Sequence, residues 1–138
     1  MKEFFSTYPV LVPVISLFVA TIFKGIFHAL AGRFSVARML NSGGMPSAHA
    51  TFVMSLTTMV GILKNVTSIE FAICLVFSVV IIYDAMNVRY QSGLHAMRLN
   101  KLAPHRDDVL NESMGHTPLE AFAGGVVGFL TAAVLMLF

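Results

Sequence analysis

Charged residues are scarce in this chain. Only 12% of its 138 residues are Asp, Glu, Lys or Arg, whereas 57% are hydrophobic and the mean hydropathy is +0.79. A soluble domain carries roughly 25% charged residues, so the sequence has about half the usual charge for staying in water. This composition argues against an ordinary soluble domain and predicts an integral membrane protein.

The chain has only one cysteine, no long run of basic residues and no obvious signal-peptide cleavage site. The single cysteine, Cys74, lies in an apolar run, so no intramolecular disulfide is possible. A formal net charge of +2 without a long basic run gives no support for nucleic acid as a partner. The first apolar stretch has no obvious small-residue cleavage site, so we interpret it as a membrane helix and not as a signal peptide. Without repeats or linkers, we expect residues 1–138 to form a single membrane-integral domain.

Four apolar segments predict the membrane helices, over residues 10–30, 48–63, 71–83 and 119–138. A spanning helix needs about 20 mostly apolar residues. The middle two segments are therefore short, and must extend into their flanks, lie in a thin region or be partly enclosed by protein. A fifth helix, residues 84–102, is too polar to span and should lie at the interface or against the bundle. The predicted fold is an all-α bundle in the cell membrane, with about four transmembrane helices and one interfacial or short helix.

Four spans place connections 25–47 and 84–118 on one side of the bilayer, with both termini and the 64–70 loop on the other. The first side carries most of the basic residues, which the positive-inside rule makes cytoplasmic. Basic residues that bind a phosphate would not report topology, so the orientation stays open.

The stretch from Asn41 to His49 (NSGGMPSAH) leads into the second predicted helix. Its glycines let the backbone approach a ligand closely. Ser47 suits the N-cap position, and the N–H groups of a helix N-terminus attract anions. His49 would lie in the first turn, aimed at such an anion. A well-capped helix start with an incidental histidine is the alternative.

The stretch from Gly115 to Glu120 (GHTPLE) leads into the last predicted helix. Thr117, Pro118 and Glu120 fit a capping box with proline at the first helical position. Capping explains these three residues but not His116, which falls on the same predicted membrane side as His49. Two histidines at the mouths of two helices, near arginines, suit nucleophilic and acid–base work on a phosphate.

Other charged residues near the apolar segments have two interpretations each. Asp84 and Arg89 form an ion pair that anchors a helix end, or they help to bind a phosphate. Lys24 reaches the headgroups from a helix end, or it contributes to the same site. Arg38 contacts a lipid headgroup, or its guanidinium forms two parallel hydrogen bonds with phosphate oxygens.

A small-residue face is formed in the last segment by Gly124, Gly125 and Gly128. Such faces let helices pack closely. The partner helix belongs either to the same chain or to a second copy, which makes a homodimer through the Gly124–Gly128 face one of the predictions.

These motifs resemble the divergent branch of the type 2 phosphatidic acid phosphatase superfamily, whose wider members include lipid phosphatases and vanadium haloperoxidases. The resemblance covers nearly the whole chain from Lys24 onward. Its most specific parts are residues 43–49, 84–89 and 115–120. It implies a phosphatase-like domain that hydrolyses a phosphomonoester or pyrophosphate of a lipid, such as phosphatidate, phosphatidylglycerol phosphate or a polyprenyl phosphate.

The resemblance also implies roles for individual residues. His116 would attack phosphorus, Glu120 would orient His116, and His49 would protonate the leaving alkoxide before the phosphohistidine is hydrolysed. The expected substrate-binding residues are Lys24, Arg38, Gly44, Ser47, Asp84 and Arg89. No metal or other cofactor is expected, because basic side chains and backbone N–H groups neutralise the transition state.

Two alternatives follow from departures in the sequence. The superfamily's third motif opens with Ser-Arg, where this chain has Val109 and Leu110, so Arg89 or Arg38 would have to replace the missing arginine. This departure leaves open a protein that binds or transports a lipid phosphate without hydrolysing it. A metal-dependent membrane hydrolase is the other alternative, with ligands drawn from Asp84, Glu120, His49 and His116.

Overall fold

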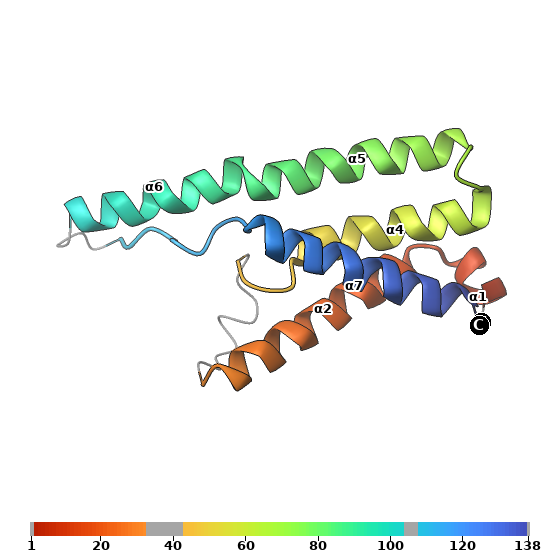
Figure 1. Cartoon of the computed structure of the whole chain (residues 1–138), viewed down its shortest axis with the longest axis horizontal. Coiled ribbons are helices and arrows are strands. Elements are labelled where there is room, and N and C mark those ends of the chain that lie inside the picture. The colour runs from red at the N-terminus through yellow and green to blue at the C-terminus, as the bar shows by residue number, and fades with distance from the viewer. Residues whose placement is uncertain (1, 33–42, 104–107, 138) are drawn as a thin grey trace.

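The structure, a computed structural model, describes residues 2–32, 43–103 and 108–137. Within these ranges the regular elements are helices: α1 (Lys2–Thr7), α2 (Leu11–Leu30), α4 (Ala48–Lys64), α5 (Ile69–Met86), α6 (Val88–Leu102) and α7 (Pro118–Leu137) (Figure 1). The all-α prediction is confirmed, and the predicted helix bounds agree to within a few residues. The short helix α1 was not predicted.

Helix α4 lies at the centre of the bundle and packs against α2, α5 and α7. A helix enclosed by its neighbours can carry hydroxyl groups that lipid would not tolerate, provided that they are hydrogen-bonded. Thr57 on α4 and Ser78 on α5 have their hydroxyl oxygens 2.7 Å apart. The Thr51 hydroxyl lies 2.9 Å from the Gly124 carbonyl of α7. Enclosure explains why this segment is short and less apolar than its neighbours.

Two glycines bring α7 close to α4. A Cβ added at Gly124 would collide with the Ser47 carbonyl oxygen, and one at Gly128 with the Thr51 carbonyl oxygen. Of the two partners considered for the small-residue face, the structure therefore pairs these glycines with a helix of the same chain. A homodimer stays a prediction, but Gly124 and Gly128 are already covered within the monomer.

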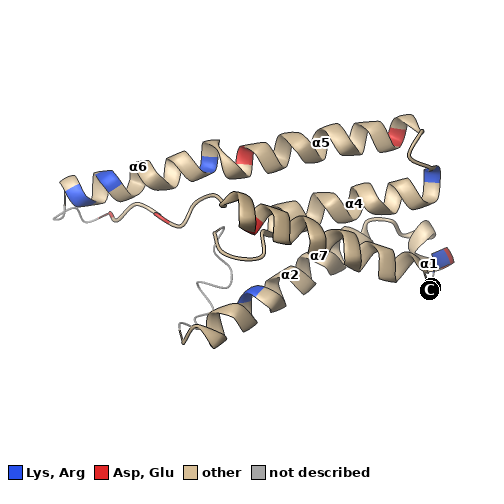
Figure 2. Ribbon diagram, in the orientation of Figure 1, with Lys and Arg blue, Asp and Glu red and all other residues tan. Residues whose placement is uncertain are grey.

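Among the described residues, three helical stretches are long and apolar enough to cross a membrane: α2, the α5–α6 stretch over residues 69–102, and α7. Lys, Arg, Asp and Glu gather along α6 and near helix ends, and the middle parts of α4, α5 and α7 carry none (Figure 2). Charges inside a bilayer are costly, so this distribution fits helices that cross it. The chain is a multi-pass membrane protein.

Helix α6 continues the line of α5 and projects beyond the bundle (Figure 1). The two are separated at Asn87, where φ is −110° and ψ is −75°. The polar helix predicted over residues 84–102 is present as α6, which begins four residues later because α5 continues to Met86. Its place at the membrane interface stays a prediction, but it does not lie flat against the bundle (Figure 1). Helix α6 instead packs against the segment that follows it, with Gly93 facing the Met114 carbonyl and the Asn100 side chain bonded to the backbone of Leu110.

The helix ends that carry the sequence motifs lie together. The C-terminal ends of α2 and α5 and the N-terminal ends of α4 and α7 point toward one end of the bundle, and α1 and the C-terminus lie at the other (Figure 1). The two motif-bearing connections therefore share one end, as predicted from the sequence.

Candidate functional site

Two histidines that are distant in sequence meet at this end of the bundle. The ring centroids of His49 and His116 lie 5.9 Å apart, with an angle of 64° between the ring planes. The sequence predicted that both would face one site, and the structure brings them together. Their catalytic roles stay predictions.

His49 is held by the capped start of α4. The Ser47 side chain accepts a hydrogen bond from the Ala50 N–H at 3.3 Å, as expected of an N-cap. The Ser47 N–H donates to the Glu120 carbonyl at 3.0 Å. These two bonds fix the first turn of α4, which carries His49, relative to the first turn of α7.

His116 is held by the end of α5. Its backbone N–H donates to the Ala85 carbonyl at 2.9 Å, a group made available because α5 ends just beyond it. The preceding residue, Gly115, has φ of +82°, and a Cβ there would collide with the backbone of Tyr90. Only glycine fits this conformation and this close approach. The His116 side chain is consequently buried, with 1% of its surface exposed.

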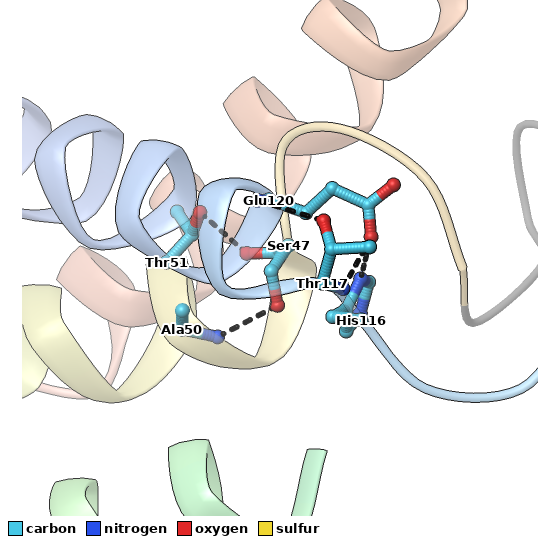
Figure 3. A network of polar contacts seen from close by, with 6 residues as sticks. All are labelled: Ser47, Ala50, Thr51, His116, Thr117 and Glu120. Carbon is cyan, nitrogen blue, oxygen red and sulfur yellow. Dashed lines mark hydrogen bonds and ion pairs between the residues drawn. The ribbon is translucent and has the colours of Figure 1, made fainter. Parts of the chain in front are cut away.

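Glu120 faces His116 and caps α7 at the same time. One carboxylate oxygen, Oε2, lies 3.5 Å from His116 Nδ1 and accepts the Thr117 N–H at 2.9 Å. The Thr117 hydroxyl accepts the Glu120 N–H at 3.4 Å, which completes the predicted capping box (Figure 3). Capping the helix and facing the imidazole are therefore compatible tasks for Glu120.

Lys24 supplies a positive charge next to these groups. It lies on α2 and is buried, with 2% of its surface exposed. It interacts electrostatically with Glu120, His116 and His49. A buried ammonium beside two imidazoles is suited to hold an anion.

Asp84 and Arg89 form an ion pair across the junction of α5 and α6. The Arg89 Nε lies 2.6 Å from the Asp84 Oδ2, and both side chains are partly exposed. Both residues also interact electrostatically with His49. The anchoring ion pair considered from the sequence is thus present, and a role in binding substrate stays a prediction. Arg38 lies outside the described residues.

A polar cavity of about 300 Å³ adjoins His116, because the residues on either side of His116 in the chain both line it. Its lining includes Glu120 and Thr117, together with Gly44, whose φ is +92°. It also includes His28 and Glu112, which we did not select from the sequence. His28 follows Lys24 by four residues and therefore shares its helix face, so this spacing could have identified His28 from the sequence. Glu112 does not lie on a helix, so no such spacing relates it to the other site residues.

Three buried imidazole nitrogens are poorly satisfied. Within the part of the chain that the structure describes, Nε2 of His116 and Nδ1 of His49 have no hydrogen-bond partner, and the 3.5 Å contact of His116 Nδ1 with Glu120 is too long to count as one. A buried polar atom without a partner costs about 1–3 kcal/mol, a cost that a catalytic role would explain. Burial also lowers the pKa of His116 from its ordinary 6.5, the Lys24 charge lowers it further, and Glu120 opposes both. His116 is therefore neutral at pH 7, as a nucleophile must be.

We expect the stability of the protein to fall as the pH drops below about 6.5. The unfolded chain protonates His116 at its ordinary pKa, whereas the folded protein resists protonation to a lower pH. Below about pH 6.5 the unfolded state thus binds more protons than the folded state. At higher pH His116 is neutral in both states and no longer makes stability depend on pH. Thermal unfolding in detergent, followed by circular dichroism, measures the effect. His116→Asn should flatten the acidic slope, and an unchanged slope in this variant would contradict the assignment.

Comparison with known proteins places the chain in a family. The model of the "Divergent PAP2 family" matches residues 5–131, so the chain belongs to this family. It is similar to the uncharacterized membrane protein YuiD of Bacillus subtilis (strain 168), with 28% identity over 99% of this chain and 98% of that protein. No solved structure matches the chain. The family inferred from the motifs is confirmed, and membership defines a class of membrane protein related to phosphatases.

Proposed function

We propose that the chain is a membrane phosphatase that removes phosphate from a lipid phosphomonoester or pyrophosphate. The whole chain acts as one domain in this proposal, with α4 as a fourth span. The observation that carries it is the meeting of His49, His116 and Glu120 beside the buried Lys24. Together these residues provide a nucleophile, an acid, an orienting carboxylate and a fixed positive charge.

The chemistry proceeds in two steps. Glu120 accepts a hydrogen bond from the Nδ1–H of His116, which keeps the proton on Nδ1 and leaves the Nε2 lone pair free to attack phosphorus. The bond to the leaving oxygen breaks as His49 gives it a proton, producing the lipid alcohol and a phosphohistidine. His49 then takes a proton from water, which attacks phosphorus and releases inorganic phosphate. Lys24 stabilises the charge on the phosphoryl oxygens in both steps.

In-line transfer constrains the two rings. The attacking nitrogen, the phosphorus, the leaving oxygen and the acid must lie nearly in a row, which needs roughly 7–8 Å between the two reacting nitrogens. Ring centroids 5.9 Å apart are close to this arrangement but tight for it. We therefore expect substrate binding to turn or separate the imidazoles.

An apolar groove supports a lipid as the substrate. It has a volume of about 490 Å³ and lies between α4, α5 and α7. One wall includes Pro118, two residues after His116, and another includes Met86, next to the Ala85 carbonyl that binds the His116 N–H. A hydrocarbon chain in this groove would bring its phosphate to the histidines.

Filling the groove should reduce activity on long-chain substrates. Gly125 lines the groove, and a Cβ there meets Met54 at an ordinary contact distance of 3.6 Å. Gly125→Leu should therefore fold, yet raise KM at least about fivefold for a long-chain lipid phosphate, because it displaces a few buried methylene groups at about 0.8 kcal/mol each. Hydrolysis of a water-soluble phosphate ester should not change. Val134→Leu, on an exposed part of α7, is the control; equal effects of both variants would count against the groove.

Phosphate release by the purified protein tests the proposal. It should free inorganic phosphate from phosphatidate, phosphatidylglycerol phosphate or a polyprenyl phosphate in the presence of a chelator. Among the described residues, no group of three or more His, Cys, Asp and Glu is placed to hold a metal ion. Activity lost in chelator and restored by one divalent ion would replace the proposal with a metal-dependent hydrolase.

A non-catalytic lipid-phosphate binder or transporter is the second candidate. Two observations favour it: Arg89 is paired with Asp84, and His116 is almost fully buried. Tight binding of a lipid phosphate without product, over the same panel of substrates, would establish the binder and overturn the phosphatase.

A further inference from the structure

The polar cavity beside His116 carries an inference about the substrate, which rests on the proposed function. We propose that this cavity binds hydroxyl groups of a polyol that carries the scissile phosphate. The enzyme would then prefer a lipid whose phosphate is attached to a glycerol or sugar headgroup over phosphatidate and over a polyprenyl diphosphate.

The lining of the cavity comes from five parts of the chain. His28 is at the end of α2, Gly44 is in the loop before α4, and Tyr90 is at the start of α6. Glu112 is in the segment after α6, and Glu120 is at the start of α7. A volume of about 300 Å³ is sufficient for a small headgroup and lies at the lower end of known ligand pockets.

The charge of the cavity distinguishes it from the phosphate position. Glu112 and Glu120 are both carboxylates, which accept hydrogen bonds from hydroxyl groups and repel phosphate oxygens. His28 adds a group that both donates and accepts. Lys24 acts on His116 and His49 as well as on Glu120, so its charge lies on the side of the cavity where these two histidines are. The phosphate is therefore held at the histidines, and the cavity is suited to hydroxyl donors.

Glu112 is held in place by its neighbours. Its Oε1 accepts a hydrogen bond from the Asn100 Nδ2 at 2.9 Å. The same amide nitrogen donates to the Leu110 carbonyl at 2.9 Å, and the Asn100 Oδ1 accepts the Leu110 N–H at 3.0 Å. The carboxylate is thus anchored to α6 and can accept a hydrogen bond from a hydroxyl group without changing its position.

The cavity also lies within reach of the reacting phosphorus. Gly115 and Thr117, the two residues that flank His116, both line it. Glu120 lines it as well, with one oxygen 3.5 Å from His116 Nδ1. A hydroxyl group one or two carbon atoms from the phosphate ester would reach the cavity when the phosphate is at His116. The apolar groove is lined by Pro118, the residue that follows Thr117, so groove and cavity meet at the same helix start.

Substrate preference tests the inference. The probes are phosphatidylglycerol phosphate and phosphatidate with identical acyl chains, compared by kcat/KM for phosphate release. The full chain should favour the glycerol phosphate at least about tenfold, and Glu112→Gln and His28→Ala should each remove about tenfold of this preference, the value of one or two hydrogen bonds. Hydrolysis of phosphatidate should change little. Glu112→Gln keeps an oxygen for Asn100 and so preserves the fold.

Glu70→Gln is the matched control, because Glu70 lies in the first turn of α5 at the far end of the bundle; it should leave the preference intact. An equal ratio of rates in the wild type and both cavity variants would overturn the polyol site while leaving the phosphatase in place. Faster hydrolysis of an amino-alcohol phosphate than of the glycerol phosphate would also overturn it, since the carboxylates would then select a cation. Absence of release from every probe would overturn the proposed function itself.

Discussion

Replacement of His116 by asparagine is expected to abolish phosphate release, with a loss on the order of 10⁴-fold or more in kcat/KM. The amide has no nitrogen that can attack phosphorus, and water must then do so without a covalent intermediate. Asparagine still offers the backbone N–H that bonds the Ala85 carbonyl, so the loop should keep its position. Release of inorganic phosphate from a lipid phosphate measures the loss, and circular dichroism confirms the fold.

Two further variants serve as a control and as a test of the proposed acid. His95→Asn, on α6 and outside the histidine pair, should retain full activity. His49→Asn should lower kcat/KM for a lipid phosphate about 10²–10⁴-fold. With p-nitrophenyl phosphate, the rate of the first step should fall much less, because this leaving group needs no proton. If His116→Asn kept more than about a tenth of wild-type activity, another residue would have to be the nucleophile.

Substitution of Gly124 or Gly128 by alanine should lower stability by about 1–3 kcal/mol each, the usual cost of overpacking, and should reduce activity as well. A Cβ at either position collides with backbone oxygen of α4, which cannot rotate away as a side chain can. Helix α7 must then move off α4 and carry Glu120 away from its hydrogen bond with the Ser47 N–H. Thermal unfolding and phosphate release, measured on the same preparations, report both effects.

Gly125→Ala is the control within the same helix. Its Cβ would meet the Met54 side chain at 3.6 Å, an ordinary contact. Stability should therefore stay level or rise by up to about 1 kcal/mol, the helix-propensity gain of alanine over glycine. Equal unfolding of all three variants would contradict the packing of α7 on α4. Loss of a dimer without loss of monomer stability in Gly124→Ala would instead support a homodimer through this face.

The helices were predictable because their cause is local. The apolar segments over residues 48–63 and 119–138, each preceded by a capping residue, Ser47 or Thr117, define α4 and α7 without reference to the rest of the chain. The direction of α6 was not predictable, since it depends on the returning segment that packs through Gly93 and Gly115. Composition alone marked residues 84–102 as polar, and a polar helix can lie in the interface or project from it.

The site was predictable in part for a similar reason. His49 and His116 each stand beside a helix cap, so the sequence placed both at the same end of a bundle. Their distance depended on contacts far apart in the chain, such as the bond from Ser47 to Glu120. The approach of Glu112 to the same site depends on the path of a segment without regular structure, which no periodic pattern indicates.

Trapping of the phosphorylated protein tests the central claim most directly. His49→Asn, mixed with p-nitrophenyl phosphate and quenched in alkali, should accumulate phosphate on His116, because the first step needs no acid and the second lacks its base. Mass spectrometry of the digest should place an acid-labile, alkali-stable phosphate on the peptide that contains His116. Phosphate on any other residue, or rapid release by this variant with no phosphorylated histidine, would contradict the mechanism.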